Sequence, residues 1–134
     1  MRRTALNRSV EELAVHIMQR HTVVLGGGTG VGKMNLLREA VATTRVAGER
    51  VRLATFSSED TSTNEGKRKL INAMYVRDLT GVAPVIVVRY YTQLEASFMT
   101  ALQPHLLHSA KKNRRRNAVV LLTLGDQEAY NATS

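Results

Sequence analysis

The sequence predicts an α/β protein with a mainly parallel sheet. Short apolar runs alternate along the chain with amphipathic stretches that are long enough to form helices. Such alternation is typical of βαβ units, in which a helix crosses over between parallel strands. The 134 residues have the length of one domain and contain no internal repeat or low-complexity linker. We therefore expect a single domain over residues 1–134.

Residues 1–21 predict a helical lead-in to this domain. Ser9 followed by Glu12 fits a capping box, so we expect the helix to begin there. Apolar residues then repeat at helical spacing: Val10, Leu13, Ala14 and Ile17. His16 and His21 are interpreted as surface residues rather than ligands, because the sequence clusters no acid or second histidine beside either of them.

Four apolar runs predict the strands: Thr22–Leu25, Val51–Phe56, Val85–Val88 and Ala118–Leu124. Between them we expect three helices: Asn35–Val46, Glu65–Arg77 and Leu94–Ala110. Gly48 ends the first of these helices, and Gly81 with Pro84 breaks the chain before the third strand. Pro104 is expected to dent the last helix.

A glycine-rich stretch separates the first strand from the helix that follows it. From Gly27 to Lys33 it fits G-x-x-x-x-G-K, the P-loop or Walker A motif that holds nucleotide phosphates. Glycines let successive backbone N–H groups face a phosphate, the helix N-terminus adds positive charge, and Lys33 reaches the β- and γ-phosphates. A glycine-rich turn without a ligand is the alternative. The predicted nucleotide-binding residues are Gly27, Gly28, Thr29, Gly30, Val31, Gly32, Lys33, Met34 and Asn35.

One position departs from the motif. The pattern has Ser or Thr after the lysine, where the hydroxyl ligates magnesium, and this chain has Met34. A thioether is a poor ligand for Mg²⁺, which takes oxygen ligands. We therefore expect ATP as the ligand, and Mg²⁺ without its usual protein anchor. The hydroxyls that could substitute belong to Thr29, Thr55, Ser57 and Ser58.

The stretch Leu25–Lys33 resembles the phosphate loop of the rotary ATPases, which include the catalytic β subunit of ATP synthase and its flagellar and secretion relatives. Their loops read G-G-x-G-V-G-K, as residues 27–33 do here. The resemblance implies a RecA-like P-loop fold in three layers, ATP binding, and work in a ring of like or unlike subunits. RecA-type recombinases and helicases share this core and are a second resemblance.

The resemblance also implies a catalytic residue. In the rotary ATPases a glutamate after the second strand orients the attacking water, and Glu59 lies at the matching distance from Lys33. The family's neighbouring arginine is replaced by Asp60. An exposed loop acid is the alternative interpretation of Glu59.

The family's metal-binding aspartate is missing from its place at the end of the last strand. Leu124 aligns with it, and Asp126 follows two residues later. Asp126 is therefore a candidate magnesium ligand, with an ordinary turn residue after Gly125 as the alternative. These departures lead us to expect ATP binding with weak or absent hydrolysis.

The composition favours anionic partners. The formal net charge is +8, and residues 111–116, Lys111 to Arg116, form the most basic run. We expect this run to bind nucleic acid or an anionic surface weakly and without specificity. A basic nucleic-acid-binding protein on a RecA-like scaffold is the alternative function. It is disfavoured because aromatic residues make up only 4% of the chain and none is interleaved with the basic run for base stacking.

Composition also bears on the compartment in which we expect the protein. The chain has no cysteine, which excludes disulfides and thiolate metal sites. No apolar run approaches the roughly 20 residues of a membrane-spanning helix. We expect a soluble protein of the cytoplasm or an organelle matrix.

Overall fold

A computed structural model describes residues 2–26, 31–76, 79–106 and 116–123. Its helices are α1 (Arg2–Met18), α2 (Val31–Val46), α3 (Asn64–Ala73), the short 3₁₀ helix η1 (Tyr91–Gln93) and α4 (Ala96–Leu106). Its strands are β1 (Thr22–Leu25), β2 (Val51–Phe56), β3 (Ala83–Arg89) and β4 (Val119–Leu122). The predicted α/β class is confirmed. In the part of the chain that is described, no helix combines the length and the apolar character needed to cross a membrane.

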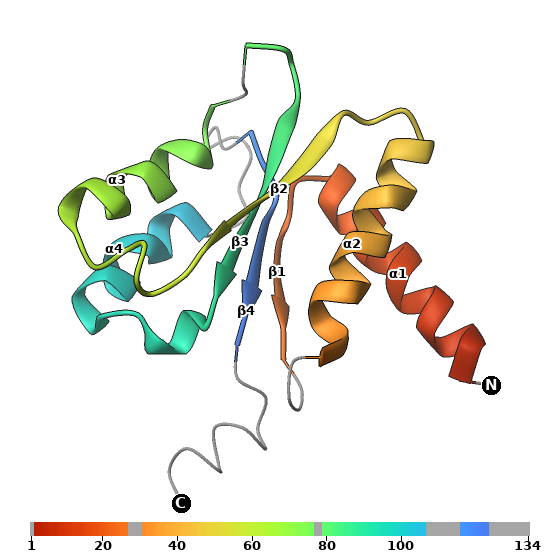
Figure 1. Ribbon diagram of the computed structural model, residues 1–134, viewed down its shortest axis with the longest axis horizontal. Coiled ribbons are helices and arrows are strands. Elements are labelled where there is room, and N and C mark those ends of the chain that lie inside the picture. The colour runs from red at the N-terminus through yellow and green to blue at the C-terminus, as the bar shows by residue number, and fades with distance from the viewer. Residues whose placement is uncertain (1, 27–30, 77–78, 107–115, 124–134) are drawn as a thin grey trace, which may run out of the picture.

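The four strands form one parallel sheet in the order β1-β4-β3-β2. β1 and β2 are consecutive in the chain but lie at opposite edges of the sheet (Figure 1). From β2 the chain returns strand by strand through β3 to β4, which fills the place between β3 and β1. The direction of strand addition therefore reverses once, at β2.

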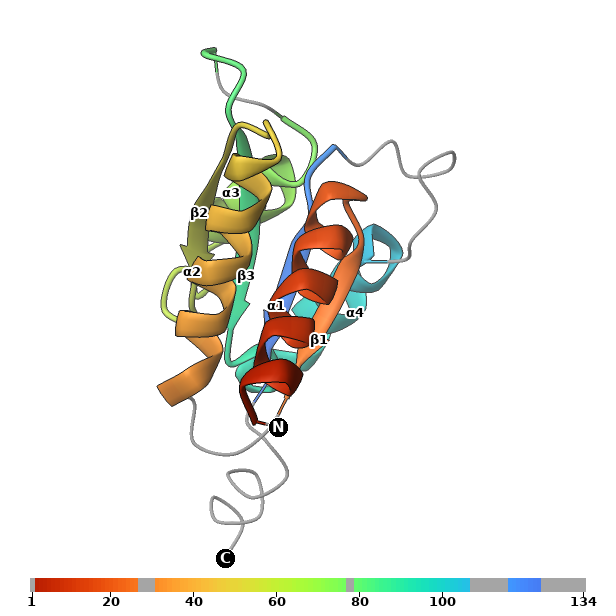
Figure 2. The same cartoon turned by 90° about the vertical axis from the view of Figure 1, so that its right-hand side faces the viewer.

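Helices cover both faces of this sheet and produce three layers. α1 and α2 pack on one face, and α3 and α4 pack on the other (Figures 1 and 2). Side chains of β3 alternate between the two layers, with Val85 and Val87 toward α1 and α2, and Ile86 and Val88 toward α3 and α4. Because both faces are buried, β3 and β4 are apolar along nearly their whole length rather than at every second residue.

The lead-in helix is longer than predicted. α1 begins at Arg2, so Ser9 lies inside the helix and does not cap it. The residues before Ser9 include Arg, Ala and Leu, which have high helix propensity and continue the helix toward the N-terminus. Leu13, Ala14 and Ile17 are buried against α2 and the sheet, which confirms the apolar face expected for this segment.

α3 ends at Ala73, four residues before the predicted end. The Asn117 side chain explains this, because its Nδ2 donates to the carbonyl oxygens of Ala73 at 2.5 Å and Val76 at 2.8 Å. The backbone N–H of Asn117 also donates to Met74 at 3.2 Å. The carbonyls at the helix end are thus satisfied by a residue more than 40 positions away in the chain.

Pro84 lies within β3 rather than before it. The N–H of Ala83 donates toward β2, to the Arg50 carbonyl at 2.8 Å, so the ring nitrogen of Pro84 faces the side of β4. Pairing with β4 starts only at Ile86, opposite Val119. The proline therefore occupies a position that has no ladder hydrogen bond to lose.

Candidate phosphate-binding site

The connections that leave β1 and β3 pass to opposite faces of the sheet, and this divergence defines a candidate site at the C-terminal ends of β1, β4 and β3. The chain leaves β1 toward α2 on one face of the sheet and leaves β3 toward α4 on the other face. β4 lies between these two strands, so the connections on its two sides diverge at its C-terminal end. Ligands of open parallel sheets bind at such a position. We call it the switch point and define it by Gly26, Thr123 and Arg89, which lie at or just beyond the ends of the three strands.

Lys33 reaches the switch point from the first turn of α2. The helix begins at Val31, and the half-buried Lys33 side chain donates from Nζ to the carbonyl oxygen of Thr123 at 2.8 Å. Thr123 directly follows β4, so a residue 90 positions earlier in the chain delivers its positive charge to the end of the central strand. The first backbone N–H groups of α2 have no partner inside the helix and give this end of α2 a partial positive charge.

The start of the predicted phosphate loop lies at the same place. Gly26 follows β1, and a Cβ added to it would lie 3.4 Å from the Thr123 hydroxyl oxygen. Gly32 belongs to the first turn of α2, where an added Cβ would meet nothing within 4 Å. Gly27, Gly28, Thr29 and Gly30 lie outside the described residues. The structure thus places both ends of the loop, and the lysine, at the switch point.

Met34 and Asn35 do not share the orientation of Lys33. The Met34 side chain is half-buried and packs against the apolar layer of α1 and α2. Asn35 is exposed, and its Oδ1 accepts from Arg38 Nη1 at 3.3 Å. The position after the lysine therefore contributes apolar packing where the motif would have a hydroxyl.

Glu59 lies at the opposite edge of the sheet. It follows β2, and both β3 and β4 separate β2 from β1. Neighbouring strands are about 4.8 Å apart, so these three steps correspond to roughly 14 Å. The side chain is exposed, and its backbone carbonyl accepts from the Ser62 hydroxyl at 2.8 Å. The catalytic role of Glu59 stays a prediction, and the sheet order disfavours it because the glutamate would have to act across two strands.

Hydrogen bonds and a close backbone contact explain the polar residues and the glycine in the turn after β2. Asp60 Oδ2 accepts from the backbone N–H and the hydroxyl of Ser57, at 2.8 and 3.1 Å. Thr63 caps α3 by accepting from the N–H of Gly66 at 3.0 Å. A Cβ added to Gly66 would overlap the carbonyl oxygen of Asp60, so only glycine fits here. The glycine at position 66 is therefore required by the shape of this turn.

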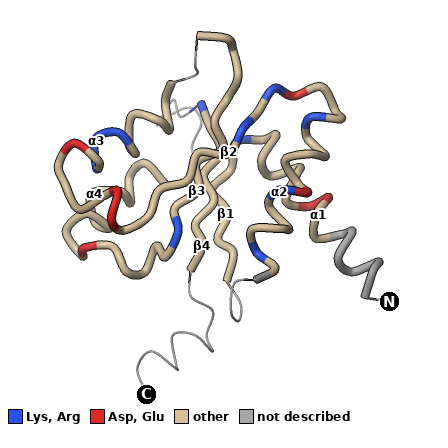
Figure 3. The backbone as a smooth tube through the Cα atoms, in the orientation of Figure 1, with Lys and Arg blue, Asp and Glu red and all other residues tan. Residues whose placement is uncertain are grey.

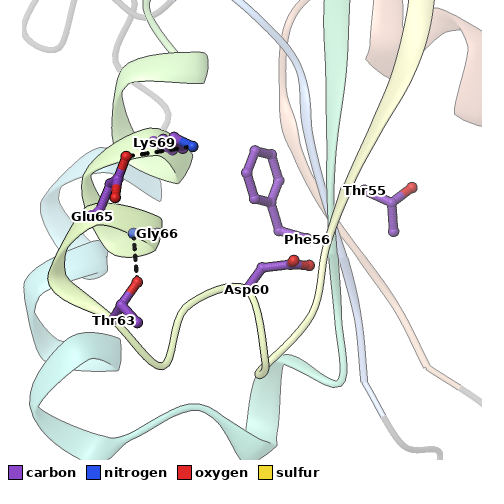
Figure 4. A pocket seen from close by; sticks show the side chains of 7 residues that line it. All are labelled: Thr55, Phe56, Asp60, Thr63, Glu65, Gly66 and Lys69. Atoms are coloured by element: carbon purple, nitrogen blue, oxygen red, sulfur yellow. Dashed lines mark hydrogen bonds and ion pairs between the residues drawn. The ribbon is translucent and has the colours of Figure 1, made fainter.

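This turn and α3 enclose a pocket of about 240 Å³ (Figure 4). It is lined by Thr55, Phe56, Asp60, Thr63, Glu65, Gly66 and Lys69. Glu65 forms an ion pair with Lys69 at 3.6 Å, so opposite charges meet at one side of the pocket. Thr55, Ser57 and Ser58, whose hydroxyls were candidate substitutes for the missing loop hydroxyl, also lie at this edge. These residues belong to β2 or follow it, and β3 and β4 separate β2 from β1, the strand that precedes Lys33.

Sequence reasoning missed Arg89 at the switch point. Arg89 ends β3 and pairs in register with Leu122 of β4. Tyr90 follows with φ 57° and ψ 48°, a left-handed conformation that is uncommon for a residue with a side chain. The Arg89 guanidinium lies over the Tyr90 ring, 5.4 Å from its centroid. The only available signal was a basic residue directly after the most apolar strand.

The two N-terminal histidines lie together, although they are five residues apart in the sequence and were expected to have no second histidine nearby. His16 and His21 have their Nδ1 atoms 2.9 Å apart. Arg20 adopts φ 60°, and hydrogen bonds run from Arg20 N to Ile17 O and from His21 N to His16 O, which is the Schellman pattern at a helix C-terminus. That pattern brings residues five apart into contact. The pair lies before β1, at the end of the sheet opposite the switch point.

The remaining predicted residues are only partly described. Asp126 and residues 111–115 lie outside the described residues, while Arg116 is exposed at the start of the segment leading to β4. Elsewhere, basic and acidic residues are scattered over the helical layers rather than gathered on one face (Figure 3). Within the described ranges, no three His, Cys, Asp or Glu residues come together as a metal site.

Comparison with known proteins leaves the function to be argued from this geometry. No protein-family model matches the sequence, and no curated protein matches it.

Proposed function

We propose that the protein binds ATP, or a closely related nucleotide, by its phosphates at the switch point. The observation that carries this proposal is the position of Lys33, whose ammonium group lies 2.8 Å from the Thr123 carbonyl at the end of the central strand β4. The lysine of a G-x-x-x-x-G-K sequence thus meets the N-terminus of the following helix and the place where an open parallel sheet binds ligands.

Each part of the site has a role in this proposal. The N–H groups at the start of α2 donate to phosphate oxygens, and the glycines of residues 27–32 allow the close approach. Lys33 adds a mobile positive charge, and it exchanges the Thr123 carbonyl for a phosphate oxygen when the nucleotide binds. Phosphate recognition of this kind is independent of the base.

Hydrolysis is proposed to be weak or absent. The side chain after the lysine packs in the apolar layer instead of offering an oxygen, and the candidate water-orienting Glu59 lies at the far edge of the sheet. A nucleotide-binding module on a RecA-like scaffold, working with like or unlike subunits, therefore fits better than an efficient ATPase.

The test is the ATP affinity of the Lys33→Ala variant, measured by isothermal titration calorimetry. A charge-assisted phosphate contact contributes roughly 1.5–3 kcal/mol, so the dissociation constant should rise about ten- to a hundredfold. Lys69→Ala is the matched control, because this lysine is exposed on α3 in the opposite layer. Unchanged affinity in a folded Lys33→Ala protein would refute the assignment.

A further inference from the structure

We propose that Arg89 neutralises the bound phosphates in the place of a metal ion. This inference rests on the proposed nucleotide binding and goes beyond it, because it assigns a second phosphate-binding cation and makes ATP binding independent of magnesium. Three observations support it: the described residues at the switch point are poor magnesium ligands, Arg89 pairs with Leu122 at the end of β4, and the backbone turns sharply after Arg89.

The residues described at the switch point do not fit a magnesium ion. The residues that follow the three strands are Gly26, Thr123 and Tyr90, and none of them is a carboxylate. The loop hydroxyl is replaced by Met34, whose side chain packs against the apolar layer. Mg²⁺ is held through carboxylates and hydroxyls together with phosphate oxygens, and the described residues that follow the three strands offer only the Thr123 and Tyr90 hydroxyls. The charge of a polyphosphate must then be balanced mainly by cationic side chains.

Arg89 lies beside the C-terminal end of β4, where a second cation could contact a bound phosphate. It pairs with Leu122, the residue before Thr123, so its backbone lies about one strand spacing from the end of β4. Alternation along β3 puts Arg89 on the same face as Val85 and Val87, the face covered by α1 and α2. The first turn of α2 carries Lys33 on that face. Lys33, through its contact with Thr123, and the backbone of Arg89, through its pairing with Leu122, therefore both lie at the C-terminal end of β4.

The chain after Arg89 supports this arrangement. Tyr90 turns the backbone sharply through its left-handed conformation and starts η1, so β3 stops directly at Arg89. The guanidinium of the exposed Arg89 lies over the Tyr90 ring, and its Nη2 lies 3.4 Å from the Tyr90 hydroxyl. This contact keeps the planar donor group at the sheet end without an acidic partner among its described contacts. Such a group can bind a phosphate through two parallel hydrogen bonds.

The experiment measures ATP affinity in magnesium and in EDTA for the wild type and for Arg89→Ala. We expect the wild-type dissociation constants in the two buffers to agree within about threefold. For Arg89→Ala we expect a loss of about tenfold or more in EDTA and a smaller loss in magnesium, because the metal then supplies the missing positive charge. Arg68→Ala, at an exposed arginine on α3, is the control and should match the wild type in both buffers.

The outcomes separate this inference from the proposed function. If ATP binds and Lys33→Ala weakens it, but Arg89→Ala binds as tightly as the wild type in EDTA, the role of Arg89 is refuted and nucleotide binding stands. Equal losses in Arg89→Ala and Arg68→Ala would also refute it, because they would show a general charge effect. If the wild type does not bind ATP, both proposals fail. Arg89→Gln, which keeps most of the side chain's length, provides the same comparison should Arg89→Ala not fold.

Discussion

Lys33 and Met34 are neighbours in the chain but serve different parts of the molecule. Lys33 donates to Thr123 at the switch point, whereas Met34 packs into the layer of α1 and α2. Helix geometry explains the difference, because successive residues of an α-helix point about 100° apart. The motif spacing singled out Lys33 but did not predict its contact with Thr123. The sequence also showed the loss of the hydroxyl at position 34, but not the apolar contacts that replaced it.

Met34→Thr should make ATP binding respond to magnesium. The substitution replaces a half-buried thioether by the hydroxyl that the P-loop motif has after its lysine as a metal ligand. We expect affinity to increase at least severalfold when magnesium replaces EDTA, against a change within threefold for the wild type. Calorimetry in the two buffers measures this. Met34→Leu is the control for lost packing and should behave as the wild type; a magnesium response of Met34→Thr no larger than that of Met34→Leu would contradict the account.

At the scale of elements, the sequence predicted the boundaries that neighbouring residues determine and missed those that depend on distant residues. β1 and β2 have the predicted bounds because each is an apolar run between polar residues and turn residues. The start of α1 and the end of α3 were wrong for different reasons: helix propensity outweighed a capping pattern at Ser9, and Asn117 ends α3 from a distant part of the chain. Distant partners of that kind leave no signal in a single sequence.

The turn between β2 and α3 makes a specific stability prediction. Gly66→Ala should lower the free energy of unfolding by about 1–3 kcal/mol, because the new methyl group collides with the Asp60 carbonyl and the turn must shift. Gly32→Ala is the matched comparison, since it also places alanine in the first turns of a helix but meets no atom within 4 Å. That variant should be as stable as the wild type or up to about 1 kcal/mol more stable. Urea denaturation measures both, and equal stability of the two variants would show that the contact at Gly66 is absent.

At the scale of the whole molecule, strand order decides which predicted residues can act together. Nothing in the sequence showed that β4 would lie between β1 and β3, yet this placement puts Arg89 beside the end of β4, where Lys33 contacts Thr123, and leaves Glu59 at the far edge. Strand pairing depends on contacts between segments far apart in the chain, so a single sequence could suggest the binding loop but not its neighbours. The histidine pair at the other end of the sheet was missed for a local reason, the left-handed Arg20.

Nucleotide phosphates are proposed to bind at the switch point. The most direct measurement is a titration of the ¹⁵N-labelled protein with ATP, followed by two-dimensional NMR of the backbone amides. We predict that the largest saturable shifts belong to Gly26, Gly32, Lys33 and Thr123, with Arg89 next, and that the Lys33→Ala variant requires about ten- to a hundredfold more ATP to reach them. Shifts centred instead on the turn after β2, on the histidine pair or around Arg116 would contradict the claim, and would place the anion site elsewhere on the molecule.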